Sequence, residues 1–239
     1  MVRKIRLSKS AIEAHKYCAR SFWLKYIIKF KTPPTEPMAR GTRFHQFADT
    51  FFDKCDELPI ERWEELIDTT LKQDEQDYQR WFIVKERERY DKLYAEGKED
   101  LFIPAFKEVH INSPDLKLHG YIDRIDCNDR EKKTFTMVEY KTSKKYKPAD
   151  VKRELAYYRM LWDDQMKDVG TITHVLIINP ECAEYQTYKV SERNITSAKE
   201  AMKQCRTAIA ANDFPRPMNL YKCNYCDLCR LYDYQTRKD

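Results

Sequence analysis

Two carboxylates and a lysine stand close together in a strand-like part of the chain. The segment HGYIDRID (119–126) carries Asp123 at the end of an apolar stretch, and MVEYKTS (137–143) follows with Glu139 and Lys141. Residues two apart on a strand face the same side, so Glu139 and Lys141 should point together. Adjacent antiparallel strands would bring Asp123 beside Glu139. Two carboxylates at one point repel each other and need a cation.

A divalent cation at this point would supply the chemistry of phosphodiester hydrolysis. Carboxylate oxygens are hard ligands that suit Mg²⁺ or Mn²⁺. Such a cation polarises a phosphoryl oxygen, lowers the pKa of a bound water and offsets the charge that builds in the transition state. Lys141 could orient or help to deprotonate that water, or stabilise the pentacovalent phosphate. An aspartate followed by Glu-x-Lys is also common by chance, and the alternative is a surface ion-pair ladder on two strands.

The composition indicates a globular protein with a heavily charged surface. The 239 residues suffice for one substantial domain, or one domain with a helical lobe. With only 4 glycines, Gly-rich phosphate loops are nearly excluded, and no Walker-type or dinucleotide-binding motif occurs. The net charge of +5 weakly favours an anionic partner. Basic residues interleaved with aromatics at 1–31 and 141–153 suit a phosphate backbone, with a solvated surface as the alternative.

The N-terminal segment and the cysteines predict an intracellular protein. MVRKIRLSKSAIEAHKYC lacks the apolar core of a signal peptide, and no window approaches the roughly 18 apolar residues of a membrane span. We therefore expect a cytoplasmic protein, or a viral protein inside a host cell, that does not contact a membrane. The 8 cysteines, in a reducing compartment, favour metal or cluster chemistry over disulfides.

Hydrophobic periodicity outlines the elements that must position these groups. Helical patterns cover the ranges 9–31, 40–57, 60–98, 150–166 and 191–211. Strand-like patterns cover Ala105–Ile111, Lys117–Asp126, Thr134–Tyr140, Ile172–Ile178 and Gln186–Val190. Ser10 and Glu13 fit a capping box for the first helix, and Ser191 can cap the last. Helices, three strands, a helix, two strands and a helix predict an α/β (α+β) fold, a mixed sheet flanked by helices.

These motifs, in this order, resemble the PD-(D/E)xK nuclease superfamily, and specifically its RecB-like exonuclease branch. That branch includes the CRISPR-associated RecB-like nucleases and many viral exonucleases. The match covers almost the whole chain through LSKSAIEAHKYCARSFWLKY (7–26), GTRFHQFAD (41–49), GYID (120–123), VEYK (138–141), ELAYY (154–158) and FPRPMNLYKCNYC (214–226). The resemblance implies a restriction-endonuclease-like domain over residues 1–239. It would comprise a helical N-terminal lobe (1–100), a catalytic core (101–212) and a cysteine-containing tail (213–239) packed on the N-terminal helix.

The resemblance also implies roles for individual residues. His45 would be a metal ligand together with Asp123, Glu139 and the main-chain carbonyl of Tyr140; the alternative for His45 is a polar contact in the core. Tyr158 would contact the substrate or support the catalytic lysine, with packing as the competing role.

Further residues would contact the substrate. Glu154 replaces the glutamine of the family motif, yet it shares a helical face with Tyr158. Glu108 lies where the family often has an acid, with a minor role. Basic side chains would follow the phosphates: Arg20, Lys144 and Lys145.

Four cysteines could hold a further metal group. Cys223, Cys226 and Cys229 form a C-x2-C-x2-C run, and Cys18 lies far upstream. Four thiolates can bind a [4Fe–4S] cluster or a tetrahedral Zn²⁺. The resemblance implies a cluster that clips the tail to the opening helix, although the last cysteine interval is shorter than the family's. Zinc, or no metal, are the alternatives.

We therefore expect a Mg²⁺- or Mn²⁺-dependent DNA exonuclease that carries a [4Fe–4S] cluster. By resemblance, it acts on single-stranded DNA ends in recombination, repair, replication or viral DNA processing. One alternative is a CRISPR-adaptation nuclease that trims spacers with integrase partners. Another is a non-catalytic nucleic-acid-binding subunit, against which the intact set of His45, Asp123, Glu139 and Lys141 argues.

Overall fold

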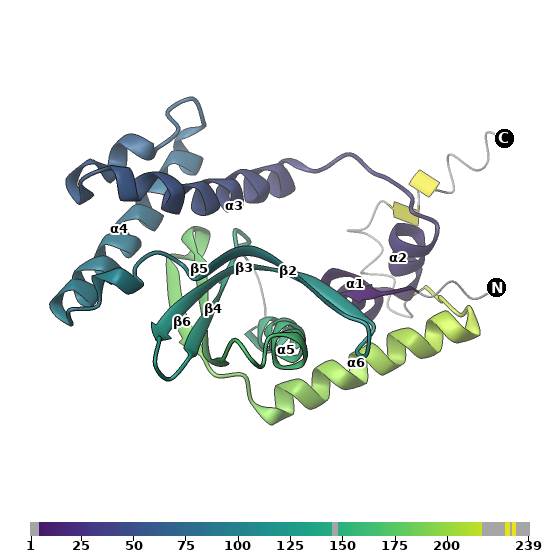
Figure 1. The fold of residues 1–239 in the computed structure, drawn as a ribbon. Helices are drawn as coiled ribbons and strands as arrows, with labels where there is room; N and C mark the ends of the chain where they lie inside the picture. The colour runs from purple at the N-terminus through teal and green to yellow at the C-terminus, as the bar shows by residue number, and fades with distance from the viewer. Residues whose placement is uncertain (1–4, 145–147, 217–227, 230, 233–239) are drawn as a thin grey trace.

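A mixed sheet forms the centre of the molecule (Figure 1). The computed structural model describes residues 5–144, 148–216, 228–229 and 231–232. The six strands are β1 (Leu7–Ser8), β2 (Phe106–Ser113), β3 (Leu118–Asp129), β4 (Thr134–Tyr140), β5 (Thr171–Asn179) and β6 (Glu184–Tyr188). Their order is β1-β3-β4-β5-β6, and β2 also pairs with β3. β1·β3 and β4·β5 are parallel and the other pairs antiparallel, so the expected mixed, restriction-endonuclease-like sheet is confirmed.

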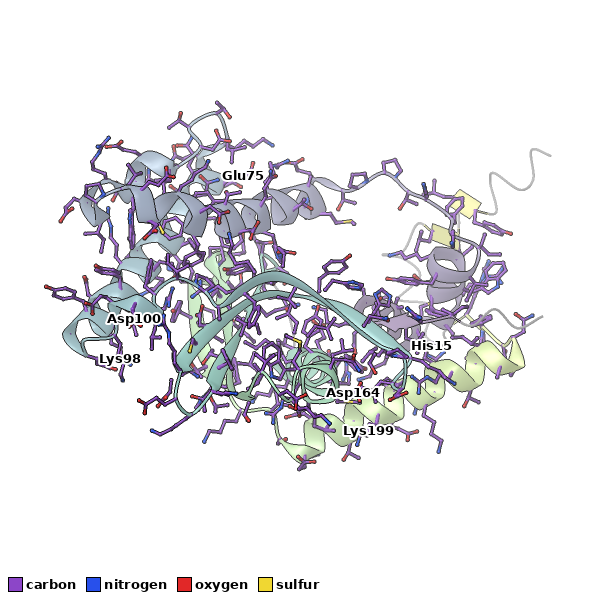
Figure 2. The ribbon with its side chains drawn as sticks, in the orientation of Figure 1. His15, Glu75, Lys98, Asp100, Asp164 and Lys199 are labelled. Atoms are coloured by element: carbon purple, nitrogen blue, oxygen red, sulfur yellow. The ribbon has the colours of Figure 1, made fainter. Side chains whose placement is uncertain are left out.

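Helices cover both faces of this sheet (Figure 1). They are α1 (Lys9–Tyr17), α2 (Ala19–Phe22), α3 (Glu36–Lys54), α4 (Gln73–Ala95), α5 (Pro148–Gln165) and α6 (Glu192–Ala211). The remaining helical segments are a π-helix, η1 (Trp23–Ile27), and four 3₁₀ helices, η2 (Cys55–Glu57), η3 (Ile60–Leu66), η4 (Glu99–Leu101) and η5 (Pro180–Cys182), among the described residues. In Figure 2, Asp164 of α5 and Lys199 of α6 lie on one side of the sheet and Glu75 of α4 on the other. Among the described residues, no helix is long and apolar enough to cross a membrane.

Each helical layer has its own hydrophobic core against the sheet. The first core joins α1, α5 and α6 to residues such as Ile122 and Met137. The second joins α3 and α4 to Val138 and Ile178 on the opposite face. Met137 and Val138 show the period of two that a strand buried on both faces requires.

β3 extends beyond its apolar segment and pairs with two different strands along one edge. Its first residues, Leu118 and His119, pair with β1, and its second half pairs with β4 from Arg124 onward. The apolar stretch ends at Asp123, but the strand continues to Asp129. Asp123 therefore lies in the middle of β3, where the strand parts from β4.

The first predicted helix is interrupted, and its predicted cap is wrong. The N-cap of α1 is Ser8, whose side chain accepts a hydrogen bond from the Ala11 amide. Cys18 then takes an extended conformation (φ −162°, ψ 110°), so the helix stops and α2 starts anew. Glu13 is not used for capping; its carboxylate accepts a 2.9 Å hydrogen bond from Arg153 on α5.

Other helix boundaries shift for identifiable reasons. α3 starts at Glu36, before the predicted residue 40, because Pro37 lies in the first turn, where a missing amide hydrogen costs nothing. The predicted helical range 60–98 consists of η3 and α4, separated by a turn. The predicted cap at Ser191 is confirmed, and it forms a capping box with Asn194 as the reciprocal partner.

Candidate active site

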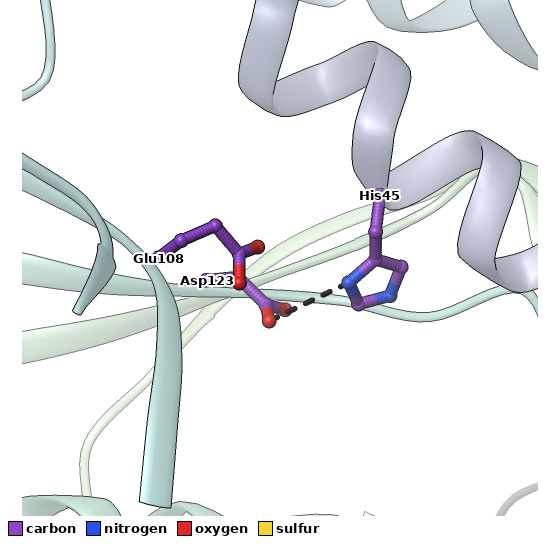
Figure 3. Close-up of side chains that lie close together, drawn as sticks. All are labelled: His45, Glu108 and Asp123. Carbon is purple, nitrogen blue, oxygen red and sulfur yellow. Dashed lines mark ion pairs between the residues drawn. The ribbon is translucent and has the colours of Figure 1, made fainter. Parts of the chain in front are cut away.

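Three potential metal ligands from three elements meet above the β2–β3 hairpin (Figure 3). His45 of α3, Glu108 of β2 and Asp123 of β3 each offer a ligand atom, and these atoms all lie within 4.8 Å of one another. His45 Nδ1 is 3.5 Å from Asp123 Oδ1. The other Asp123 oxygen accepts a 2.7 Å hydrogen bond from the Tyr140 amide, which ties it to β4. One imidazole and two carboxylates fit a hard divalent cation such as Mn²⁺ or Mg²⁺.

The alternation of side chains is interrupted in the β2–β3 hairpin, and this interruption turns Glu108 and Asp123 toward His45. Val109 and Ile122 are cross-strand partners that pack into the core on the α5 side, so their neighbours Glu108 and Asp123 face α3. Lys107 also faces α3, through a 2.6 Å ion pair, so two consecutive residues of β2 point the same way. The backbone of Glu108 accommodates this with φ 47°, a conformation costly for a residue other than glycine. Such outliers cluster at functional sites.

Negative charge accumulates in this cluster. Burial alone would lower the pKa of His45, but the hydrogen bond and charge of Asp123 outweigh it and raise the pKa. Burial and the charge of Asp123 both raise the pKa of Glu108. Both shifts reflect a potential that favours positive charge, and a bound cation would relieve the repulsion between the carboxylates.

Glu139 lies between two lysines at the end of β4. Its Oε1 is 2.6 Å from Lys9 Nζ and 2.9 Å from Lys141 Nζ. Lys141 also contacts Glu154 at 2.8 Å, and Lys9 lies 3.8 Å from the same carboxylate. Burial alone would raise the pKa of Glu139, but the two lysines outweigh it and lower the pKa to about 2. As predicted, Glu139 and Lys141 point to the same side.

Tyr158 packs beneath this charged group. Its side chain is buried, and Lys9 Nζ lies 4.7 Å above the centre of its ring. On β3, a Cβ atom at Gly120 would lie only 2.8 Å from the Tyr158 ring. The absent side chain of Gly120 therefore lets α5 approach the sheet and lets Tyr158 support Lys9 from below.

The remaining predicted contact residues have protein partners of their own. The carboxylate of Glu154 contacts Lys141. The guanidinium of Arg20 lies 4.1 Å from the centre of the Trp23 ring. Lys144 lies 3.2 Å from Glu181, and Lys145 is outside the described residues. The structure thus brings Glu154 into the lysine–carboxylate group, whereas Arg20 and Lys144 are engaged elsewhere.

Two of the four predicted cluster cysteines belong to the described chain. Cys18 is buried between α1 and α2, where its sulfur accepts a hydrogen bond from the Ser21 amide at 3.4 Å. Cys229 is partly buried. Cys223 and Cys226 lie outside the described residues.

The C-terminal segment contacts the aromatic residues that follow Cys18. The Tyr232 ring lies 5.8 Å from that of Trp23 and 5.6 Å from that of Phe30. Phe214 lies 5.8 Å from Phe22. These contacts bring the chain around Cys229 back to the opening helices.

Lys9 is the site residue that the sequence pattern does not reveal. Its partner Glu139 is 130 residues away, and nothing local connects the two. One signal was available: Lys9 begins a helix whose first turn contains no acid. A helix N-terminus disfavours a cation, so a lysine there needs a carboxylate from elsewhere.

Comparisons with known proteins give a family and a fold. Residues 6–231 match the family model of the PD-(D/E)XK nuclease superfamily. A solved structure from Eubacterium rectale, of a protein provisionally described as an exonuclease, has a TM-score of 0.55 with 11% identity. The alignment covers 95% of this chain and 88% of that one. No curated protein matches the chain.

Proposed function

The chain belongs to the PD-(D/E)XK nuclease superfamily, and we propose that it is a metal-dependent DNA exonuclease. The observation that carries this proposal is the convergence of His45, Glu108 and Asp123, with ligand atoms within 4.8 Å of one another. These residues come from three elements, and Asp123 accepts a hydrogen bond from the amide of Tyr140, the residue between Glu139 and Lys141. A surface ion-pair ladder does not explain a strained backbone at Glu108 or the buried carboxylate of Glu139.

The two groups of residues divide the work of the proposed reaction. His45, Glu108 and Asp123 would hold a Mg²⁺ or Mn²⁺ ion, with Glu139 and the Tyr140 carbonyl as further ligands. The ion supplies Lewis-acid activation of the phosphate and of the attacking water.

Lys141 places its ammonium beside the Glu139 carboxylate, where it can orient the water or offset charge on the phosphate. Glu154 pairs with Lys141, and Lys9 pairs with Glu139, so these two contacts fix the position of the catalytic pair. We propose single-stranded DNA ends as the substrate, in keeping with the branch that the motifs resemble.

End-labelled DNA tests this function. Single- and double-stranded substrates labelled at either end are incubated with the protein in Mn²⁺ or Mg²⁺, and products are followed over time. We expect shortening from an end of the single strand. Asp123→Ala should lower the rate at least a thousandfold, since it removes a ligand of the activating ion. Asp91→Ala, at an exposed aspartate of α4, is the matched control. Equal cleavage by the Asp123 variant would overturn the site, and DNA binding without cleavage in any metal would indicate a non-catalytic subunit.

We also propose that Cys18, Cys223, Cys226 and Cys229 bind a [4Fe–4S] cluster. The aromatic contacts of Tyr232 with Trp23 and Phe30 support this, since they bring the C-terminal segment to the region of Cys18. Anaerobically purified protein should be brown and contain iron and acid-labile sulfide. Colourless protein with stoichiometric zinc would instead support a tetrahedral zinc site.

A further inference from the structure

An exposed row of aromatic rings lies next to the candidate metal ligands. On β2 and β3, His110 and Tyr121 are direct cross-strand partners. Their rings stack with centroids 4.5 Å apart and an interplanar angle of 23°. The His119 ring meets that of His110 edge-on at 5.8 Å. Tyr121 remains 55% exposed, so this stack leaves an aromatic surface open to solvent.

The aromatic row and the metal ligands share one face of the hairpin. Val109 and Ile122 separate the two rows along the strands and point into the core on the opposite side. Gly120 also faces that side, because its missing side chain would meet Tyr158 of α5. Tyr121 therefore faces away from α5, as Asp123 does. Two strand residues span about 7 Å, so the Tyr121 ring follows directly after the candidate metal site.

The side chain of Arg6 lies beside the next cross-strand pair on the same face of the hairpin. Asn112 pairs with His119 across the hairpin, and Arg6 donates a 3.1 Å hydrogen bond to the Asn112 side chain. Arg6 reaches over β3 because its neighbour Leu7 is fully buried in the core below. The guanidinium of Arg6 is exposed and has further donors for a phosphate. Metal ligands, aromatic rings and an arginine thus follow one another along one surface.

We propose that His110, Tyr121 and Arg6 form a subsite for one nucleotide of single-stranded DNA, next to the phosphate that is cleaved. The base stacks on the Tyr121 ring, which His110 supports from the other side, and an adjoining phosphate pairs with Arg6. Inside a duplex both faces of a base are covered by its neighbours, so an internal base can lie on Tyr121 only when it is unpaired and unstacked. Aromatic stacking accepts any base, so this subsite selects strandedness and not sequence. The inference rests on the proposed function, for which it specifies the substrate.

Binding of fluorescent oligodeoxynucleotides tests the subsite. Affinities of the full-length protein are measured by anisotropy in EDTA and again in Ca²⁺. We expect Tyr121→Ala to weaken single-strand binding about tenfold. Tyr121→Phe keeps the ring and should bind within about twofold of the wild type. Arg6→Ala should weaken binding and reduce the salt dependence by about one ion. Tyr94→Ala, at another exposed and stacked tyrosine on α4, is the matched control.

A substrate with a single abasic position locates the contact. In the wild type, one abasic position near the cleaved end should weaken binding about as much as Tyr121→Ala. In the Tyr121→Ala protein, the same position should cost nothing further, because the stacking partner is already absent. If Tyr121 has only a structural role, Tyr121→Ala should weaken binding by the same factor wherever the abasic position lies. That result would overturn the proposal. Tyr121-dependent binding confined to duplex DNA or to RNA would overturn it as well.

The subsite and the proposed activity can fail separately. If cleavage depends on Asp123 but Tyr121→Ala binds single strands like the wild type, the subsite is wrong and the activity stands. If Tyr121 and the abasic position are coupled in binding but no metal supports cleavage, the subsite stands and the activity is wrong.

Discussion

Asp123 and Arg124 are neighbours in β3, but the charges around them are arranged differently. The Arg124 guanidinium contacts Asp126 at 2.7 Å and Glu86 of α4 at 2.8 Å, and its side chain is 1% exposed. Arg89 completes this group with a 2.7 Å contact to Glu86. Two arginines and two carboxylates therefore balance each other away from solvent.

The charges around Asp123 are not closed in this way. Asp123 lies with Glu108 and His45, whose side chain is 34% exposed, and carboxylates outnumber cations there. Their ligand atoms converge on one point, whereas the atoms of the Arg124 group are paired with each other. We infer that the balanced, enclosed set of Arg124, Arg89, Glu86 and Asp126 fixes α4 to the sheet. An unbalanced, accessible set next to it remains able to bind a cation.

The largest effect is expected from removing Arg124, the central cation of the enclosed set. Arg124→Met would leave Glu86 and Asp126 buried without their shared cation, and should lower the free energy of unfolding by about 3–5 kcal/mol. Urea denaturation measures this, and cleavage per folded molecule should persist. Adding Asp126→Asn to Arg124→Met should restore much of the stability, since Glu86 then pairs with Arg89 and no uncompensated charge remains. A fully stable single variant would show that Arg124 does not hold the lobe.

In the accessible site, a substitution is expected to reduce activity strongly and stability only slightly. Lys141→Met should reduce the cleavage rate about 100- to 1000-fold, as removal of one charge-stabilising donor does in other active sites. Its unfolding free energy should change far less than that of the Arg124 variant, because Lys9 still pairs with Glu139. Lys132→Met, at an exposed lysine, is the control. Large destabilisation with unchanged cleavage would assign Lys141 to structure.

A smaller effect is expected at Lys9, which positions Glu139 and does not reach the substrate in our proposal. Lys9→Met should lower kcat about tenfold, the order of one well-placed hydrogen bond to a charge, with KM nearly unchanged. Lys9→Arg should recover part of kcat because it keeps the charge. If KM rises while kcat stays constant, Lys9 binds DNA directly.

The last expected effect is the pH dependence of stability that arises from Asp126 in the enclosed set. Burial alone would raise the pKa of Asp126, but Arg124 and Arg89 outweigh it and lower the pKa in the folded protein. In the unfolded chain the carboxyl has an ordinary pKa of about 3.9. The stabilisation is therefore complete well above pH 4 and is lost as pH falls toward the lowered pKa. Asp126→Asn should cost about 2 kcal/mol at pH 7, and the difference from wild type should shrink below about pH 4. A constant difference across this range would exclude Asp126 as its source.

Local patterns predicted much of the fold because their causes are local. The pattern of Thr134–Tyr140 predicts the strand that the structure shows as β4, and Ser191 caps α6 as its sequence indicates. Ser10 and Glu13 fit the capping-box pattern, but the helix begins one residue before Ser10 and its N-cap is Ser8. Glu13, the second half of the predicted cap, pairs with Arg153 of α5 instead.

The site was less accessible to sequence reasoning because its geometry arises from distant segments. The family motifs around His45 and Asp123 predicted that these residues meet, although no local pattern shows that their contact joins α3 to the central sheet. Glu108 reaches the candidate metal site through a left-handed backbone conformation, which no local sequence signal predicts. Lys9 reaches Glu139 only because β1 pairs with the far end of β3.

The close packing at Gly120 predicts how substitutions there behave in a genetic screen. A side chain there would collide with Tyr158 and, at 3.3 Å, crowd Leu161, so a library of random variants should tolerate Gly120 substitutions as poorly as those at Asp123. The two intolerances would differ in their suppressors. A smaller residue at position 161 or 158 can make room for alanine at position 120, whereas no second-site change restores a lost carboxylate. Suppressor selection would thus separate residues that shape the reaction centre from residues that take part in it.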